Sequence, residues 1–243
     1  MNYNKALEER FAETGIWFTE SLVASNWKTA PGSFLWLYGI PGCGKTILSS
    51  TIIEAIFDHC SNNSSLAVLY FYFDFNDAEK QRPESTIRSL IIQLSLQCIS
   101  VPQTLNSLYR TCTDGQRQPA YDSLLETLQQ MIGVFQEIYL VIDALDESSD
   151  RYELLANIKE MTSWKDANLH TLVTSRREKD IVDSMEYLTD QEKVCIQNIH
   201  INDDIRAYVR GRLFTDPKLK RWRNQPRVQL EIEITLMEKV DGM

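Results

Sequence analysis

The segment Gly39-Ile40-Pro41-Gly42-Cys43-Gly44-Lys45-Thr46 has residue types and a spacing that suit the binding of a polyphosphate. It fits the P-loop pattern, which is a glycine, any four residues and then Gly-Lys-Ser/Thr. Glycines let backbone N–H groups turn toward phosphate oxygens, the lysine reaches the β- and γ-phosphates, and the hydroxyl binds Mg²⁺. We therefore expect a bound nucleotide to contact Gly39, Pro41, Gly42, Cys43, Gly44, Lys45, Thr46 and Ile47.

The sequence on both sides of this loop supports the interpretation. The residues before it, Phe34 to Tyr38, are aromatic and apolar, which is typical of a buried strand. The residues after it place Leu48, Ile52 and Ile56 at helical spacing. A helix that starts there points its positive end at a bound anion. The alternative, a glycine turn between two core elements, explains less of this context.

A second group of polar residues follows the apolar run Ile138 to Ile142. Asp143 comes directly after this run, and an acid at the end of such a strand holds Mg²⁺ opposite the P-loop hydroxyl. Asp146 and Glu147 come next, and either carboxylate can orient or deprotonate an attacking water. We favour Glu147 slightly. The alternative for both acids is a structural role at the start of the next helix.

An arginine pair follows the next apolar run, Leu169 to Thr174. A guanidinium beside the γ-phosphate reports its presence and stabilises charge during phosphoryl transfer. We assign this role to Arg176, with Arg177 as the close alternative. An exposed arginine pair at the start of a helix is the structural alternative.

These residues need a parallel sheet to bring them together. Apolar strands alternating with helical patterns predict an α/β sandwich with a five-stranded, mainly parallel sheet, in which ligands bind beyond the carboxyl ends of the strands. We expect strands at 34–38, 66–75, 137–142, 169–174 and 194–199, and helices at 1–14, 18–27, 83–98, 102–112, 122–132, 151–161, from 203 and from 228. We divide the chain into an N-terminal helical lead-in (1–30), a nucleotide-binding domain (31–200) and an incomplete helical subdomain (201–243).

Composition excludes several classes of partner and location. The chain has 243 residues with a formal net charge of −9, which argues against a nucleic-acid backbone as the main partner. The five cysteines show no metal-binding spacing, so a reducing compartment fits best. The longest apolar run, Leu66 to Phe73, is too short to span a bilayer, and we see no signal peptide. We therefore expect a cytoplasmic protein without a membrane span.

Taken together, these motifs resemble the NACHT family of STAND P-loop NTPases, above all its fungal heterokaryon-incompatibility members and the nephrocystin-like N-terminal module. The resemblance covers nearly the whole chain. It includes Thr14 to Trp17 before the P-loop, Tyr70 to Phe75, Arg88 to Leu94, the acid run from Asp143 and the Thr174-Ser175-Arg176 element. Trp17 either walls the pocket for the nucleotide base or packs in the core.

The resemblance implies a signalling switch with slow hydrolysis. Members of the family rest with ADP or GDP, exchange it for ATP or GTP with Mg²⁺, and then self-associate or pair with related NACHT proteins. The resemblance also implies the additional-strand sheet order, in which the Thr174 strand separates the P-loop strand from the Asp143 strand. By comparison with the family, the chain stops before the helical arm is complete, so it looks truncated at its C-terminus.

Two other functions remain open from the sequence. The chain is alternatively a non-catalytic interaction module that pairs with full-length relatives. A small-molecule or nucleoside kinase shares the P-loop, although the acid run after Asp143 and the Thr-Ser-Arg element argue against it. We recognise no sequence motif that distinguishes ATP from GTP.

Overall fold

The structure is a computed structural model, and it describes residues 3–11, 14–164, 168–188, 193–196 and 199–240. Its centre is a parallel sheet in the order β2-β3-β4-β1-β5. The strands are β1 (Phe34–Tyr38), β2 (Leu66–Tyr72), β3 (Glu137–Asp143), β4 (Leu169–Ser175) and β5 (Lys193–Cys195). The predicted α/β fold is confirmed, and β4 does separate the P-loop strand β1 from the Asp143 strand β3.

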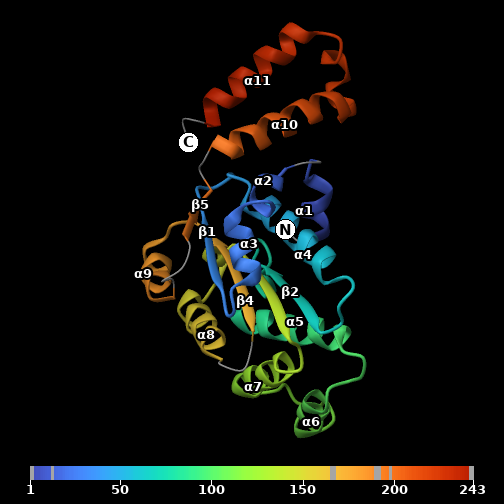
Figure 1. The fold of residues 1–243 in the computed structure, drawn as a ribbon, viewed down its shortest axis with the longest axis vertical. Helices are drawn as coiled ribbons and strands as arrows, with labels where there is room; N and C mark the ends of the chain where they lie inside the picture. The colour runs from blue at the N-terminus through green and yellow to red at the C-terminus, as the bar shows by residue number, and fades with distance from the viewer. Residues whose placement is uncertain (1–2, 12–13, 165–167, 189–192, 197–198, 241–243) are drawn as a thin grey trace.

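Helices cover both faces of this sheet, as Figure 1 shows. The helices are α1 (Tyr3–Glu9), α2 (Ile16–Thr19), α3 (Leu22–Thr29), α4 (Lys45–Cys60), α5 (Pro83–Gln97), α6 (Gln103–Thr111), α7 (Tyr121–Ile132), α8 (Arg151–Ser163), α9 (Lys179–Leu188), α10 (Ile199–Thr215) and α11 (Pro226–Val240). Side chains of α5, α7, α8 and α9 share one core cluster with the sheet, and side chains of α2, α3 and α4 share the other. The result is a three-layer sandwich.

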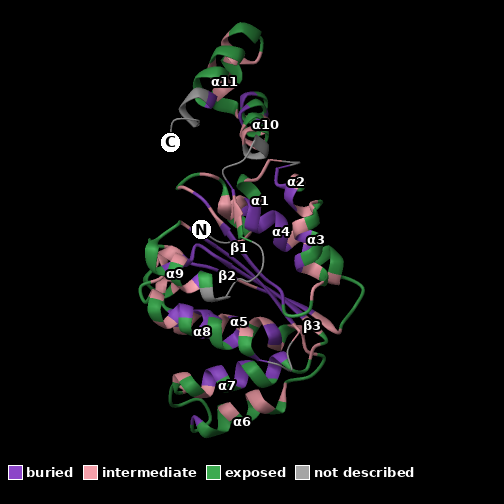
Figure 2. Cartoon of the chain, turned by 60° about the vertical axis from the view of Figure 1, so that its left-hand side comes forward, coloured by how far each residue is buried: buried purple, intermediate pink, exposed green. Residues whose placement is uncertain are grey.

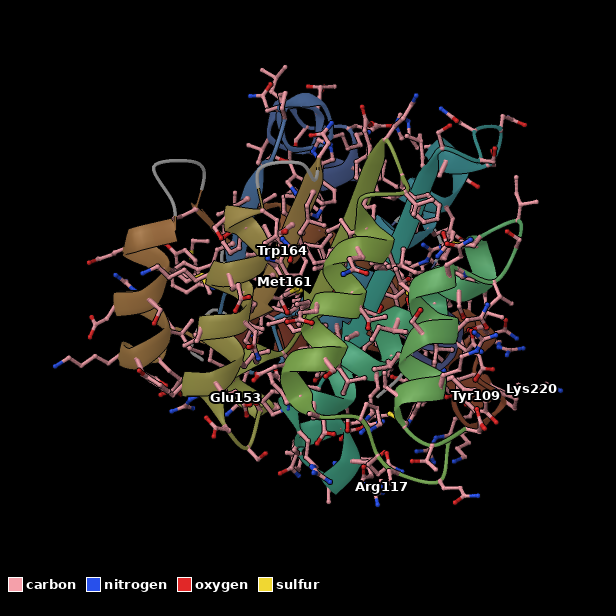
Figure 3. The ribbon with its side chains drawn as sticks, turned by 90° about the horizontal axis from the view of Figure 1, so that it is seen from below. Tyr109, Arg117, Glu153, Met161, Trp164 and Lys220 are labelled. Atoms are coloured by element: carbon pink, nitrogen blue, oxygen red, sulfur yellow. The ribbon has the colours of Figure 1, made fainter. Side chains whose placement is uncertain are left out.

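The side chains of β1 alternate between the two core clusters. Phe34 and Trp36 belong to the first cluster, whereas Leu35 and Leu37 belong to the second. Successive residues of a strand point to opposite faces, so a strand covered on both sides is apolar throughout. Figure 2 shows β1, β2 and β3 buried along most of their length. At the far end of the first cluster, Met161 and Trp164 pack at the C-terminal end of α8 (Figure 3).

The open edge of β2 is closed by two glutamine side chains of α5. Gln97 accepts a hydrogen bond from the backbone N–H of Val68 (3.0 Å) and donates one to its carbonyl (2.9 Å). Gln93 makes the same pair of bonds with Tyr70, at 3.0 and 2.7 Å. An exposed row of backbone groups invites pairing with another strand, and these amides occupy it. The two glutamines are about one helical turn apart on α5, and this spacing matches the distance between alternate residues of β2.

Several element boundaries differ from the predicted ones. The predicted helix over 18–27 is two helices, because the chain turns at Ser21, whose hydroxyl accepts from Ala24 N–H and caps α3. The first helix ends at Glu9, and β2 ends at Tyr72, three residues earlier than predicted. Helix α7 begins at Tyr121, with Ala120 at its N-cap, one residue before the predicted start at position 122.

The C-terminal helices α10 and α11 lie beside each other and extend away from the sheet (Figure 1). They are joined by an ion pair between Arg210 and Glu233, with N–O distances of 2.8 Å. Helix α10 begins at Ile199, earlier than the Asp203-Asp204 start that the sequence suggested. No helix within the described residues is long and apolar enough to cross a membrane.

Candidate functional site

The predicted P-loop connects β1 to α4 at the carboxyl edge of the sheet. Gly42 and Gly44 have φ angles of 79° and 83°, which is the left-handed region where a glycine costs least. Gly39 is needed for a different reason, because a Cβ there would lie 2.6 Å from the Cys43 sulfur. The predicted glycines therefore have a physical role in shaping the loop. Pro41 is exposed at the tip of the turn.

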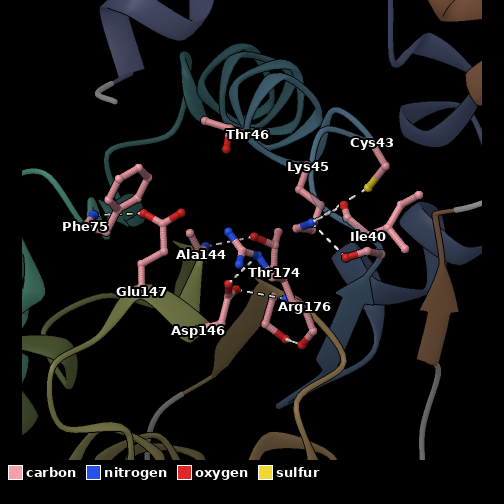
Figure 4. A network of polar contacts seen from close by, with 12 residues as sticks. Ile40, Cys43, Lys45, Thr46, Phe75, Ala144, Asp146, Glu147, Thr174 and Arg176 are labelled. Carbon is pink, nitrogen blue, oxygen red and sulfur yellow. Dashed lines mark hydrogen bonds and ion pairs between the residues drawn. The ribbon is translucent and has the colours of Figure 1, made fainter. Parts of the chain in front are cut away.

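Lys45 lies across this loop. Its Nζ donates to the carbonyl oxygens of Gly39 and Ile40, both at 2.9 Å, and lies 3.8 Å from the Cys43 sulfur (Figure 4). Burial raises the pKa of the Cys43 thiol, although the Lys45 charge opposes this. A thiol with a raised pKa is poorly reactive, so the geometry favours an ordinary packing role for Cys43.

Asp143 lies at the end of β3 and faces the start of α4. Its Oδ2 accepts from the Thr46 hydroxyl at 2.8 Å, and its Oδ1 accepts from the hydroxyls of Ser49 and Thr174, both at 2.7 Å. Asp143 is 1% exposed. Burial raises the pKa of Asp143, whereas the three hydroxyl donors and the nearby Lys45 lower it. Thr46 and Asp143, predicted to share a metal ion, are thus in direct contact.

Ser49 and Thr174 were not singled out by the sequence as partners of the acid. Ser49 lies one helical turn after Thr46, so helical spacing alone offered a signal for it. Thr174 lies on the neighbouring strand β4, so its contact with Asp143 depends on the order of the strands in the sheet. Its Oγ1 also accepts from Ala144 N–H at 2.9 Å, where the chain leaves β3. Ala144 has a φ of 60°, which is unusual for a residue with a side chain and turns the backbone sharply after Asp143.

Asp146 and Arg176 form an ion pair at the same edge. Arg176 Nε lies 3.1 Å from Asp146 Oδ2, and the Arg176 backbone N–H donates to Oδ1 at 2.8 Å (Figure 4). Arg177 instead lies over the ring of Tyr38, 5.7 Å from its centroid. The two arginines left open by the sequence therefore have different surroundings, and Arg176 is the one beside the acid run.

Glu147 lies apart from Asp146 and is bound on the β2 side. Its Oε2 accepts from the Phe75 backbone N–H at 3.0 Å. Burial raises the pKa of Glu147, the Phe75 hydrogen bond lowers it, and the neighbouring carboxylates of Asp146 and Asp143 raise it further. The two acids that the sequence could not separate therefore have different partners.

A cavity of about 230 Å³ adjoins the other side of the P-loop. Its walls include Gly42, Gly44 and Ile47 from the loop and α4, Trp17 from α2, and Tyr208 from α10. Trp17 also packs against the second core cluster, which is one of the two roles considered for it from the sequence, and its contact with a nucleotide base stays a prediction. Ligand pockets for drug-sized molecules are about 300–1,000 Å³, so this cavity suits part of a nucleotide, such as a base.

The described residues contain no cluster of three or more His, Cys, Asp or Glu side chains that could hold a metal ion. The oxygen donors at the P-loop are the Thr46 hydroxyl and the Asp143 carboxylate. Both are hard ligands of the kind that Mg²⁺ accepts, and this ion is usually bound by one or two carboxylates together with substrate phosphates. The donor set therefore fits Mg²⁺ held jointly by the chain and a ligand.

Three solved structures with a related fold are distantly similar to this chain. The Aeropyrum pernix ORC1 protein in complex with DNA has 15% identity and a TM-score of 0.49, covering 74% of this chain and 43% of that chain. A DNA replication initiation factor has 13% identity and a TM-score of 0.48, covering 100% and 63%. C. elegans PCH-2 has 13% identity and a TM-score of 0.42, covering 87% and 51%. Likeness at this level carries no conclusion about partners or activity.

Comparison at the level of sequence is more informative. The vegetative incompatibility protein HET-E-1 of Podospora anserina is 26% identical over 191 residues, which are 74% of this chain and 13% of that protein. The chain thus spans a small part of the length of this relative. Residues 13–176, more than half of the chain, match the family described as Nephrocystin 3, N-terminal. This match includes the P-loop, the Asp143 run and Arg176, and the chain therefore belongs to the nephrocystin 3 N-terminal family.

Proposed function

We propose that the chain is a Mg²⁺-dependent switch that binds a purine nucleoside triphosphate and hydrolyses it slowly at the γ-phosphate. One observation carries the proposal. The P-loop hydroxyl of Thr46 donates directly to Asp143, 97 residues away in the sequence, in a site that Lys45 and Arg176 also border. Such a convergence at the carboxyl edge of a parallel sheet is the arrangement of P-loop NTPases.

Thr46 and Asp143 would hold the magnesium ion. Bound there, the ion neutralises charge on the β- and γ-phosphate oxygens. Burial and three hydroxyl donors fix the carboxylate of Asp143 in place, so it needs little reorganisation to act as a ligand. Ser49 and Thr174 are therefore positioning residues for this carboxylate.

Lys45 and Arg176 would contact the phosphates. The Lys45 ammonium donates to two neutral carbonyl groups, and a phosphate oxygen is a stronger, charged acceptor. Arg176 is partly exposed, at 43%, and is anchored to Asp146, from where its guanidinium can turn toward a γ-phosphate. Both cations would thus exchange protein contacts for phosphate contacts when the nucleotide binds. This exchange would favour the nucleotide-bound one of two conformations of the chain.

Glu147 would orient and deprotonate the attacking water. Its raised pKa makes it a stronger base than an ordinary glutamate. Asp146 is committed to Arg176 and has 5% side-chain exposure, so it suits this role less. The hydrogen bond from Phe75 N–H fixes the Glu147 side chain on the β2 side of the site.

The nucleotide base would enter the cavity beside Gly42, Gly44 and Ile47. Aromatic walls such as Trp17 can stack on a purine, and both ATP and GTP remain candidates. We assign residues 31–200 to the nucleotide-binding domain, 1–30 to its lead-in and 201–243 to a helical subdomain. The similarity to a vegetative incompatibility protein supports a signalling role. None of the five cysteines, all within the described residues, forms a disulfide, and this supports a cytoplasmic location.

Release of inorganic phosphate from ATP and GTP tests this proposal. We expect slow, Mg²⁺-dependent release that accumulates with the purified chain and stops in EDTA. Transfer of the γ-phosphate to an added hydroxyl acceptor, rather than to water, would favour a kinase instead. Tight binding without any phosphate release would support a switch that does not reset by its own hydrolysis.

A further inference from the structure

Helix α10 is attached to the segment that precedes the P-loop through one carboxylate. Asp204 Oδ2 accepts hydrogen bonds from the Gly15 backbone N–H and from Trp17 Nε1–H, both at 2.9 Å. The donors come from the start of the chain, 189 and 187 residues away. These are charge-assisted bonds, which are stronger than bonds between neutral groups.

The segment that Asp204 binds is itself fixed to the P-loop helix. Thr51 on α4 donates to the Thr14 carbonyl at 3.1 Å. Gly15 has a φ of 82°, and a Cβ there would lie 3.0–3.2 Å from Leu48 and Thr51. The segment around Gly15 therefore cannot move far without disturbing α4, which begins with Lys45 and Thr46.

A second close contact joins α10 to the N-terminal region. Gly211 lies against the ring of Phe11, and a Cβ at this glycine would come within 1.9 Å of a ring carbon. The two helical turns between Asp204 and Gly211 thus lie along the N-terminal segment. The cavity beside the P-loop lies between these elements, with Trp17, Asp204 and Tyr208 among its walls.

We propose that Asp204 is a positioning residue that holds α10 and Trp17 together as one wall of the base cavity, and that it thereby sets the affinity for the nucleoside part of the ligand. This inference rests on the proposed function. Asp204 would act on affinity through the shape of the cavity. Among the described residues, Lys45, Thr46 and Asp143 do not line this cavity, so affinity for a bare polyphosphate should not depend on Asp204.

The test compares two ligands on four proteins. Binding of ATP and GTP, and of inorganic tripolyphosphate, is titrated with Mg²⁺ for the wild type, Asp204→Ala, Asp204→Asn and Asp203→Ala. Asp203 is the matched control, because it is the neighbouring acid on α10 and its side chain is 66% exposed. Asparagine keeps an oxygen that accepts both bonds, whereas alanine keeps none.

We expect Asp204→Ala to weaken nucleoside triphosphate binding about tenfold while tripolyphosphate affinity stays at the wild-type value. Asp204→Asn should restore most of the loss, and Asp203→Ala should behave as the wild type. Unchanged nucleotide affinity in Asp204→Ala, or an equal loss for both ligands, would overturn the inference. Failure of the wild type to bind either ligand would instead contradict the proposed function.

Hydrogen exchange tests the attachment independently of any ligand. Asp204→Ala should speed exchange in the first turns of α10 and around Gly15 to Trp17, and Asp203→Ala should not. If exchange in both regions is the same in Asp204→Ala as in the wild type, Asp204 does not hold the wall together.

Discussion

Asp146 binds Arg176 at two points, the guanidinium at 3.1 Å and the backbone N–H at 2.8 Å. The acid is nearly buried, with a side-chain exposure of 5%, whereas the arginine is 43% exposed. The Asp146 carboxylate therefore fixes the backbone and the Nε atom of Arg176, while the rest of the guanidinium stays accessible to a ligand. This relationship separates two acids that are adjacent in the sequence, because Glu147 binds Phe75 instead.

Arg176→Ala should reduce phosphate release by about 10²- to 10³-fold with little change in nucleotide affinity, because its charge acts mainly when the γ-phosphate is transferred. Asp146→Ala should reduce release in the same direction by a smaller factor. The double variant should be no slower than Arg176→Ala alone, since both changes remove one unit. Single-turnover rates measure this. Arg177→Ala, which removes a contact with Tyr38, is the control. Additive losses in the double variant would show that Asp146 acts separately.

Glu147→Gln should leave nucleotide affinity within about twofold and slow hydrolysis by about 10²- to 10⁴-fold, since it removes a general base. In the wild type the rate should fall with decreasing pH through the pKa of Glu147, because only the ionised carboxylate accepts a proton. Burial raises that pKa, so the fall of the hydrolysis rate at low pH should be centred above the value of about 4.3 for a free glutamate. A pH–rate profile of the two proteins checks this, and an unchanged limb in Glu147→Gln would assign it to another group.

Asp143→Asn should stabilise the ligand-free protein by about 1 kcal/mol, a few degrees in Tm, and abolish Mg²⁺-dependent nucleotide binding. The pKa of Asp143 is higher in the folded chain than in the unfolded chain, because the carboxylate is buried. The folded state then binds more protons, so stability falls as pH rises through this pKa, and the ionised form is destabilising near pH 7. Thermal melts at pH 7 test this, with exposed Asp183→Asn on α9 as the control. A lower Tm for Asp143→Asn would mean that its hydroxyl partners outweigh the cost of burial.

Much of the fold was predictable because its signals are local. The apolar run Phe34 to Tyr38, the glycine spacing and the acid after Ile142 each lie within one segment, and a parallel sheet necessarily brings strand ends together. The partners that fix the site were not predictable in this way. Thr174 beside Asp143, and Asp204 beside Gly15, are contacts between segments far apart in the chain. Their residue types alone carry no information about these pairings.

Some predicted element boundaries were wrong for a related reason. The predicted second helix divides at Ser21 because a hydroxyl cap competes with helix continuation. The predicted end of β2 was late because an apolar run does not mark where strand pairing stops. The backbone at Ala144, with a φ of 60°, was also beyond prediction, since alanine gives no sign of a left-handed conformation.

Replacing Gln93 and Gln97 together by alanine should lower the free energy of unfolding by about 2 kcal/mol, at about 1 kcal/mol for the lost hydrogen bonds of each side chain. It should also cause concentration-dependent association, because the edge of β2 becomes available to another strand. Denaturant unfolding and sedimentation measure the two effects. The control is Gln129→Ala with Gln130→Ala, two exposed glutamines on α7. A monomeric double variant with wild-type stability would contradict this account of the edge.

The most direct test of the central claim is a titration of fluorescent ATP and GTP analogues into the wild type and Lys45→Ala. Lys45 lies across the P-loop, bound to the carbonyls of Gly39 and Ile40, where a phosphate would take over its contacts. Lys218→Ala, at an exposed lysine outside the site, is the control. The account predicts saturable, Mg²⁺-dependent binding in the wild type and in Lys218→Ala, and a loss of at least about a hundredfold in Lys45→Ala. Equal binding by Lys45→Ala and the wild type, or no binding by a folded wild type, would contradict it.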